Sequence, residues 1–425
     1  MSLLFKGGYV VDAANNFEGI ADILVDEGKI VKCAPNIEED GAEVVDCSGL
    51  HVIPGICDMH VHFRDPGQTH KEDILTGCEA AVAGGVTAVA CMPNTTPPVD
   101  NPEIVKYIID KAKGAKAKVY PVGCITKGLN GEELCDFNAL RDAGCVAVSD
   151  DGKPVRNARI MARAMVKAHY AGLRVISHCE DPDIIAGGIM NSGIISKELG
   201  VKGMHRLSED TQTAREIVLA ADLEMPIHIA HVSTSTSMML VRIGARYGAM
   251  VTSETCPHYF MLTDEKLRAR DADYRMNPPL RTEDDVTAIT EGVCDGTIDC
   301  IVTDHAPHAP NEKADFEHAP NGVVGLETSL AATLTELYHN GKITLRRIVK
   351  LMCVNPRKIL NVPGGSFTEG EPADITIFNI NEEWTVDPDK LHSKSHNTCF
   401  KGMTLKGRVK MTVVDGEIVY KDSCE

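Results

Sequence analysis

Between about residues 55 and 345 the chain alternates short apolar, β-branched runs with longer amphipathic segments. The short runs predict eight strands: Ile56–Val61, Val86–Met92, Lys118–Cys124, Cys145–Ser149, Leu173–Ser177, Ile227–Ala230, Ala249–Ser253 and Ile298–Thr303. The longer segments predict helices, among them Glu72–Ala83, Asn101–Lys113, Asn157–Ala171, Glu209–Ala221, Ser235–Tyr247 and Glu283–Cys294. Strand and helix in strict alternation predict a parallel sheet, and eight such units favour an α/β fold of the closed (β/α)8 TIM type. An open doubly wound sheet is the alternative, although no G-x-G-x-x-G follows the first strand.

Both ends of the chain carry a different pattern, in which short alternating strands surround tight turns. Near the N-terminus these strands are Ala21–Val25 and Lys29–Cys33, and near the C-terminus they are Asp374–Phe378, Arg408–Val413 and Glu417–Tyr420. We therefore expect residues 1–54 and 366–425 to pair into one small composite β domain beside a barrel of residues 55–365.

Composition narrows the class of protein. The chain has 425 residues, 43% hydrophobic and 24% charged, and no apolar run of the roughly 18 residues that a membrane helix needs. The first residues, with Lys6 among them, lack the apolar core of a signal peptide, so we expect a cytoplasmic protein. A net charge of -18 argues against nucleic acid or an anionic membrane as partner. The 15 cysteines include no C-x-x-C pair and are expected to be reduced, buried residues.

Polar side chains follow the predicted strands at the ends where a barrel of this type places its site. His60 and His62 alternate on the first strand and therefore project to one side, as two ligands of a metal ion would. Further strands end at Asp150-Asp151, His178, His231 and Asp304. Each of these residues alone is as readily a turn, a helix cap or a hydrogen-bonded histidine. Their joint placement at one end of separate strands favours a metal site.

These residues belong to a set of motifs that resembles the cyclic amidohydrolase superfamily and, more closely, the type I dihydroorotase family. The motifs are His60-Val61-His62-Phe63-Arg64-Asp65-Pro66-Gly67, Met92-Pro93-Asn94-Thr95, Ser149-Asp150-Asp151-Gly152, His178-Cys179-Glu180, His231-Val232-Ser233, Glu254-Thr255-Cys256-Pro257-His258, Asn277-Pro278-Pro279-Leu280-Arg281 and Asp304-His305-Ala306-Pro307-His308. The resemblance spans nearly the whole chain. It implies a zinc-dependent, reversible cyclisation of N-carbamoyl-L-aspartate to L-dihydroorotate in the biosynthesis of UMP.

The resemblance also implies two zinc ions per subunit, bridged by Asp151 and a hydroxide. His60 and His62 would hold one ion, and His178 and His231 the other. Many relatives bridge with a carbamylated lysine, but no lysine precedes Asp151 in this run, and Lys153 lies past the turn. Asp150 is the alternative bridge. Asp304 would be a weak ligand of the first ion and the catalytic proton shuttle.

Substrate recognition is expected to involve Arg64, since a guanidinium matches the carboxylate outside the dihydroorotate ring. The alternative for Arg64 is a surface salt bridge with Asp65. By the resemblance, the other substrate contacts are His62, Asn94, Asn277, His308, and the backbone groups of Asn321 and Gly322. The polar stretch from His308 to Asn321 is expected to be a loop that closes over the barrel mouth.

Two other functions stay open at this point. An allantoinase or dihydropyrimidinase would use the same metal ligands, but its substrate lacks the carboxylate that Arg64 would bind. A silent homologue would serve as a structural partner of aspartate transcarbamoylase and would be expected to lack metal ligands, which are all present here. The sequence leaves the oligomeric state undecided, with a homodimer as one expectation and association with aspartate transcarbamoylase as another.

Overall fold

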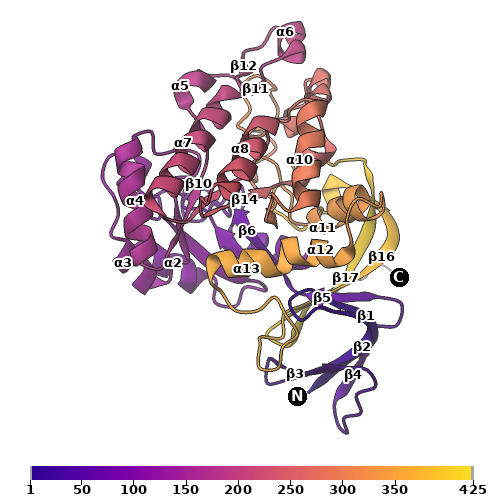
Figure 1. The fold of residues 1–425 in the computed structure, drawn as a ribbon. Coiled ribbons are helices and arrows are strands. Elements are labelled where there is room, and N and C mark those ends of the chain that lie inside the picture. The colour runs from indigo at the N-terminus through magenta and orange to yellow at the C-terminus, as the bar shows by residue number, and fades with distance from the viewer. Residues whose placement is uncertain (1, 423–425) are drawn as a thin grey trace.

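A computed structural model describes residues 2–422 and places the middle of the chain in a barrel of eight parallel strands (Figure 1). In sheet order the strands are β6 (Ile56–Val61), β7 (Val86–Cys91), β8 (Lys118–Cys124), β9 (Ala147–Ser149), β10 (Arg174–Ser177), β13 (Ile227–Ile229), β14 (Val251–Thr255) and β15 (Cys300–Ile301). The ring closes because Val61 bridges to His305, whose carbonyl accepts the His62 N–H at 2.8 Å. The predicted barrel is confirmed, and the open sheet is excluded.

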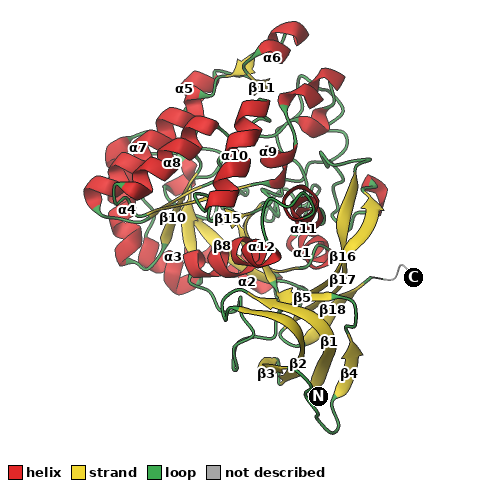
Figure 2. Ribbon diagram, turned by 45° about the vertical axis from the view of Figure 1, so that its right-hand side comes forward, coloured by secondary structure: helices red, strands yellow, loops and turns green. Residues whose placement is uncertain are grey.

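Helices surround the barrel (Figure 2). They are α1 (Ile74–Ala83), α2 (Pro102–Lys111), α3 (Phe137–Ala143), α4 (Ala158–Tyr170), α7 (Leu207–Leu223), α8 (Ser235–Arg246), α9 (Pro257–Met261), α10 (Glu283–Asp295), α11 (Ser329–Thr333), α12 (Leu345–Val349) and α13 (Asn355–Leu360). An excursion after β10 holds α5 (Pro182–Ile185), β11 (Met190–Asn191), α6 (Ile194–Leu199) and β12 (Gly203–Met204). Short 3-10 or π segments cover Lys127–Leu129, Asp264–Ala269, Ala272–Tyr274, Leu334–Tyr338, Lys350–Val354 and Pro388–Lys390. Within residues 2–422, no helix combines the length and apolar character needed to span a membrane.

Several short elements differ from the sequence prediction, and for two of them the reason can be identified. The sequence predicts the last barrel strand over Ile298–Thr303, but it pairs only at Cys300–Ile301, because the Thr303 N–H donates to the side-chain carboxylate of Asp58 in β6 instead of to a backbone carbonyl. Helix α3 was not expected. It is short, and the Asp136 side chain accepts the Ala139 N–H at its start.

The barrel strands are buried on both faces, which explains their nearly continuous apolar sequences. Every residue of β6 and β7 is buried. Burial of the polar residues Asp58 and His60 inside β6 costs free energy unless each finds a partner. The thiols follow the prediction: every cysteine among the described residues is free, and all but Cys33 and Cys294 are buried, while Cys424 lies outside the described range.

The two ends of the chain share one sheet, as the sequence predicts. Its order is β18 (Glu417–Lys421), β17 (Thr404–Val414), β16 (Ile375–Thr385), β5 (His51–Pro54), β1 (Leu3–Asp12), β2 (Phe17–Asp26) and β3 (Lys29–Ala34), with β4 (Glu43–Asp46) beside β1. In Figure 1 the indigo strands meet the yellow ones where β5 pairs antiparallel with β16, with Val52 opposite Ile377. The domain boundaries at 54/55 and 365/366 stay a prediction.

Arg357 joins the barrel to this composite sheet. Its side chain is 2% exposed and donates to the Gly55 carbonyl at 2.5 Å and to the Thr87 hydroxyl at 2.9 Å. The same guanidinium lies 3.5 Å from the Asp374 carboxylate, just before β16. A buried cation with several partners resists replacement, because each partner would lose a hydrogen bond that no water restores.

We expect Arg357→Met to lower the free energy of unfolding by about 3 kcal/mol, because it leaves buried acceptors unpaired. Chemical denaturation of the purified variant measures this change. Lys358→Met, at the exposed neighbouring position, is the matched control and should change stability little. Equal stability of Arg357→Met and wild type would contradict this account of the junction.

Candidate metal and substrate site

The polar residues predicted from the strand ends meet around one cavity at the carboxyl end of the barrel strands. The cavity has a volume of about 160 Å³. Its lining consists of His62, Arg64, Asn94, Asp151, Gly152, His178, His231, Asn277, Asp304, Ala306, Asn321 and Gly322. His60 lies fully buried beneath this lining, within 3.4 Å of Asp151. Residues from at least six separate parts of the chain thus form one small polar chamber.

Asp151 stands between the histidines. Its Oδ1 lies 3.4 Å from His60 Nε2, 3.4 Å from His178 Nδ1 and 3.7 Å from His231 Nε2. Its Oδ2 lies 3.6 Å from His62 Nε2. These side chains make two groups whose ligand atoms lie close enough together to hold a metal ion, His60 with His62 and Asp151, and Asp151 with His178 and His231. The shared member of both groups is one carboxylate.

The donor atoms in this centre have the properties that a divalent cation requires. His60 Nε2 and Asp151 Oδ1 are buried and have no hydrogen-bond partner in the protein. Buried polar atoms without a partner are costly, and imidazole nitrogens with a carboxylate oxygen are a ligand set typical of zinc and similar metals. The residues present therefore fit two metal ions with Asp151 between them.

Asp150, the alternative bridge, turns away from the histidines. Its Oδ1 accepts the backbone N–H groups of Ile125 and Thr126 at 2.8 and 3.0 Å, and its Oδ2 accepts the Thr126 hydroxyl. Asp150 thereby fixes the turn after β8. Only Asp151 of the pair is a member of the two ligand groups.

Asp304 lies beside the first of these ligand groups. Its Oδ1 is 3.0 Å from His62 Nε2 and 3.6 Å from His60 Nε2. Burial raises the pKa of Asp304, but the hydrogen bond with His62 and the charge on His60 outweigh it and hold the pKa below the ordinary value. Asp304 is therefore an ionised acceptor at neutral pH that reaches both the histidines and the cavity.

Three site residues have left-handed backbone conformations that side chains other than glycine rarely adopt. Their φ angles are +60° at Arg64, +32° at His231 and +49° at Asp304. Each conformation costs about 1–3 kcal/mol and persists only where surrounding contacts enforce it. At the end of a strand, this turn of the backbone directs the side chain into the barrel mouth.

An outer layer of polar side chains orients the histidines. His60 Nδ1 lies 2.6 Å from Glu254 Oε1, His178 Nε2 lies 3.2 Å from Glu180 Oε2, and His62 Nδ1 lies 2.8 Å from Asn94 Oδ1. Partners of this kind fix the ring orientation of metal-binding histidines. Sequence reasoning assigned no role to Glu254 or Glu180. The available signals were a carboxylate near the end of β14 and the alternation of His178 with Glu180.

The carboxylates favour positive charge at these rings. Burial alone lowers the pKa of His60, but the charge of Glu254 and the close carboxylates of Asp151 and Glu254 raise it well above its ordinary value. For His178 the same opposition, with Asp151 and Glu180 as the acidic partners, raises the pKa to about 10. Metal ions held by His60 and His178 would supply positive charge that these carboxylates could stabilise.

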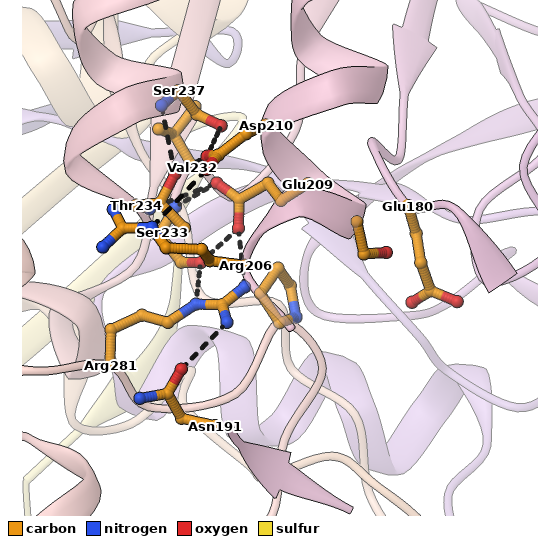
Figure 3. Close-up of polar contacts among 12 residues, drawn as sticks. Glu180, Asn191, Arg206, Glu209, Asp210, Val232, Ser233, Thr234, Ser237 and Arg281 are labelled. Carbon is orange, nitrogen blue, oxygen red and sulfur yellow. Dashed lines mark hydrogen bonds and ion pairs between the residues drawn. The ribbon is translucent and has the colours of Figure 1, made fainter. Parts of the chain in front are cut away.

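The backbone after His231 is held by a buried ion pair (Figure 3). Glu209 Oε1 accepts the N–H groups of Ser233 and Thr234 at 2.9 and 3.2 Å. Glu209 Oε2 lies 3.2 Å from the Arg281 guanidinium, whose Nε donates to the Ser233 hydroxyl at 3.0 Å. These contacts fix the chain two residues beyond His231 and so help to maintain its left-handed conformation.

Arg64 lines the cavity and does not form the surface salt bridge with Asp65. Arg64 Nε donates to the Pro307 carbonyl at 3.2 Å, while the Asp65 carboxylate accepts the Tyr107 hydroxyl at 2.8 Å. Burial lowers the pKa of Arg64 to about 10, so the side chain remains a cation at neutral pH. An anionic group entering the cavity would find this charge available.

The loop from His308 to Asn321 lies beside Arg64. His308 Nε2 is 3.3 Å from Arg64 Nη2 and 2.9 Å from the Asn321 carbonyl. Burial and the charges of Arg64 and Lys71 lower the pKa of His308 to about 2, so the ring is neutral. The loop therefore adds a neutral hydrogen-bonding group beside the Arg64 cation.

The other predicted substrate contacts are also at the cavity. Asn94 Nδ2 donates to Asp151 Oδ2 at 3.1 Å, and Asn277 donates to Glu180. The backbone groups of Gly322 are already used within the protein, since its N–H donates to the Arg275 carbonyl at 2.9 Å. Gly322 has φ +138°, and an added Cβ would lie 3.0 Å from His308 Nε2. Glycine at this position therefore keeps space for His308.

Comparisons with known proteins agree with this arrangement. The family described as dihydro-orotase-like matches residues 49–237. A dihydroorotase of Geobacter metallireducens is 49% identical over 424 residues, covering 99% of this chain and 100% of the relative. A dihydroorotase of Acetivibrio thermocellus is 48% identical over 422 residues, covering 99% of each chain.

The fold is also that of a solved L-hydantoinase (dihydropyrimidinase) from Arthrobacter aurescens, with a TM-score of 0.88 and 24% identity, over 99% of this chain and 96% of the other. At this identity the likeness concerns the fold alone. The dihydroorotases, in contrast, are nearly one half identical along the full length, so the similarity includes the barrel, the cavity and the composite sheet together. The chain therefore belongs to the dihydroorotase family.

Proposed function

We propose that this protein interconverts N-carbamoyl-L-aspartate and L-dihydroorotate in the biosynthesis of UMP, with two zinc ions held by His60, His62, Asp151, His178 and His231. One observation carries the proposal. Two ligand groups meet at Asp151 on one side of a cavity of about 160 Å³, and the Arg64 cation lines the same cavity. A hydrolytic centre and an anion-binding group thus lie within reach of one small ring.

Bound divalent cations would lower the pKa of a coordinated water and polarise a carbonyl oxygen. The protein itself supplies the remaining steps. In the proposed hydrolysis, Asp304 accepts the proton of the attacking water and delivers it to the departing amide nitrogen of the ring. In ring closure, Asp304 takes the proton from the ureido nitrogen. Its ionised state and its place beside His62 and His60 support this role.

Arg64 would bind the carboxylate outside the ring through charge-assisted hydrogen bonds, with Asn94, His308 and Asn277 around the rest of the substrate. Asn321 would contact the ring through its backbone, since its side-chain oxygen already accepts from Arg275 Nη2 at 3.2 Å. Gly322 would act through its small size, because its carbonyl already accepts Lys313 Nζ at 2.9 Å. The ring is thereby oriented with its reacting amide toward Asp151 and Asp304.

Three further expectations remain predictions that go with this function. The cytoplasm is the expected compartment, a homodimer is the expected assembly, and association with aspartate transcarbamoylase is a second interaction to examine. The proposed division into residues 1–54, 55–365 and 366–425 likewise awaits a test by limited proteolysis.

The purified protein should interconvert carbamoyl-aspartate and dihydroorotate, lose this activity after treatment with a chelator, and regain it when zinc is added back. Ring closure consumes one carboxylate charge and takes up a proton, so the equilibrium should shift toward dihydroorotate as the pH falls. Absorbance of the ring amide follows both directions. Activity that is confined to allantoin or hydantoins would refute the substrate, and activity that is unaffected by complete metal removal would refute the metal centre.

We expect Asp151→Asn to reduce zinc content and to lower kcat at least about 100-fold, because it removes the shared charge from both ligand groups. Elemental analysis together with steady-state kinetics measures both effects. Asp150→Asn is the matched control: it should loosen the turn at Thr126 while zinc content stays at the wild-type level. Full zinc occupancy in Asp151→Asn would indicate a bridge by Asp150 or Lys153.

We expect Arg64→Met to raise KM for dihydroorotate about 30-fold, which corresponds to the loss of about 2 kcal/mol from a charge-assisted hydrogen bond. Zinc content should stay unchanged, since Arg64 is not a member of either ligand group. Arg64→Lys keeps the charge without the planar fork and should lie between the two. An unchanged KM in Arg64→Met would favour a substrate without a carboxylate, as in the dihydropyrimidinase alternative.

A further inference from the structure

The segment 391–397 reaches from the C-terminal part of the chain to the substrate cavity. It lies between Pro388–Lys390 and β17 and runs back over the barrel beside α1. Ser393 donates its hydroxyl to Glu72 at 2.5 Å, and the Ser393 N–H donates to Glu327 at 3.1 Å. Ser395 donates to the Lys71 carbonyl at 2.6 Å. This strap, residues 391–397, is thus attached to the barrel along its length and ends at Asn397.

Asn397 is 5% exposed and uses its whole side-chain amide on the loop of residues 306–322. Its Oδ1 accepts the His308 N–H at 3.1 Å. Its Nδ2 donates to the Gly322 carbonyl at 3.0 Å and, at the longer distance of 3.5 Å, to the Ala306 carbonyl. The amide therefore joins the beginning of the loop to its end.

Neighbouring contacts complete this closure. The Asn397 carbonyl accepts the Val324 N–H at 3.1 Å, just beyond the loop. Lys313, within the loop, donates to the carbonyls of Arg275, Pro320 and Gly322 at 3.2, 3.1 and 2.9 Å. Lys313, which belongs to the loop, and Asn397, which does not, both donate to the Gly322 carbonyl. Together they hold the two ends of the loop near each other.

We propose that Asn397 is a positioning residue of the substrate site: its amide fixes His308 and Gly322 at the separation that substrate binding requires. This inference rests on the proposed function for the roles of His308 and Gly322. Asn397 is not itself a lining residue of the cavity or a member of the metal-ligand groups, although it contacts the lining residues Ala306 and Gly322. It acts by holding the backbone at two points of the loop that carries His308 and Asn321.

The chemistry of the amide makes the proposal specific. At this position the side chain must accept from one N–H and donate to two carbonyl groups, and asparagine does this with separate atoms, one oxygen that accepts and one NH2 that donates twice. Aspartate has nearly the same shape but cannot donate when ionised. It would place a negative oxygen against the Gly322 carbonyl, and the two would repel each other.

The test compares Asn397→Asp with wild type and with Ser393→Ala. We expect Asn397→Asp to raise KM for dihydroorotate about 10- to 100-fold, with kcat within about threefold of wild type and unchanged zinc content. Ser393→Ala weakens the strap elsewhere and should keep the wild-type KM. Asn397→Ser, which keeps a hydroxyl near the His308 N–H but is too short for the Gly322 carbonyl, is the second variant if Asn397→Asp does not fold.

Hydrogen–deuterium exchange of residues 306–322 gives a readout that does not depend on activity. Faster exchange in Asn397→Asp, together with the increase in KM alone, supports the proposal. An unchanged KM, an equal increase in Ser393→Ala, or a loss of kcat that follows a loss of zinc overturns it. If the wild-type protein does not act on dihydroorotate, the proposed function fails, and exchange in the loop still decides whether Asn397 holds it closed.

Discussion

Convergence of the imidazole rings on one carboxylate is the constraint on which the rest of this structure depends. Asp151 Oδ1 lies within 3.7 Å of nitrogens of His60, His178 and His231, although these residues come from three different strands. Only a closed barrel directs the ends of all its strands toward one point. The short apolar, β-branched strands are therefore indirectly required by the site, because they determine how near the ligands approach.

Holding polar groups at this density has a cost that the surrounding protein offsets. The left-handed residues Arg64, His231 and Asp304 would each relax to an ordinary conformation in an unconstrained chain. Glu209 and Arg281 hold the backbone beyond His231, and Glu254 holds the ring of His60. Much of the buried polar chemistry in the barrel thus stabilises the site geometry and not the barrel alone.

The sequence predicts the barrel well because its signal is local. In β6 the apolar run and the alternation of His60 with His62 lie within a few residues, so both the strand and the ligand pair could be recognised. The sequence could not decide whether Asp150 or Asp151 is the bridge, because the two adjacent residues differ only in the direction in which their side chains point. That direction depends on the N–H groups of Ile125 and Thr126, which belong to another strand's turn.

The sequence did not predict contacts between distant segments, because residues that meet only in the fold share no local pattern. Glu254 lies 194 positions from its partner His60, and Asn397 lies 89 positions from His308. Neither residue stands in a pattern with its partner. The predicted last barrel strand is also too long, because the Thr303 N–H donates to the side chain of Asp58, 245 positions away in β6, the strand that closes the ring.

The antiparallel contact of β5 with β16 sets an order of assembly. During translation, β1–β5 emerge first and their partner strand β16 follows only after the whole barrel. At about 5–20 residues per second, that interval lasts on the order of tens of seconds. The edge of β5 remains without its neighbour throughout, whereas the barrel strands meet their partners in sequence. Maturation of the terminal sheet is therefore a late event, and the nascent chain must protect an unpaired strand edge until β16 has been synthesised.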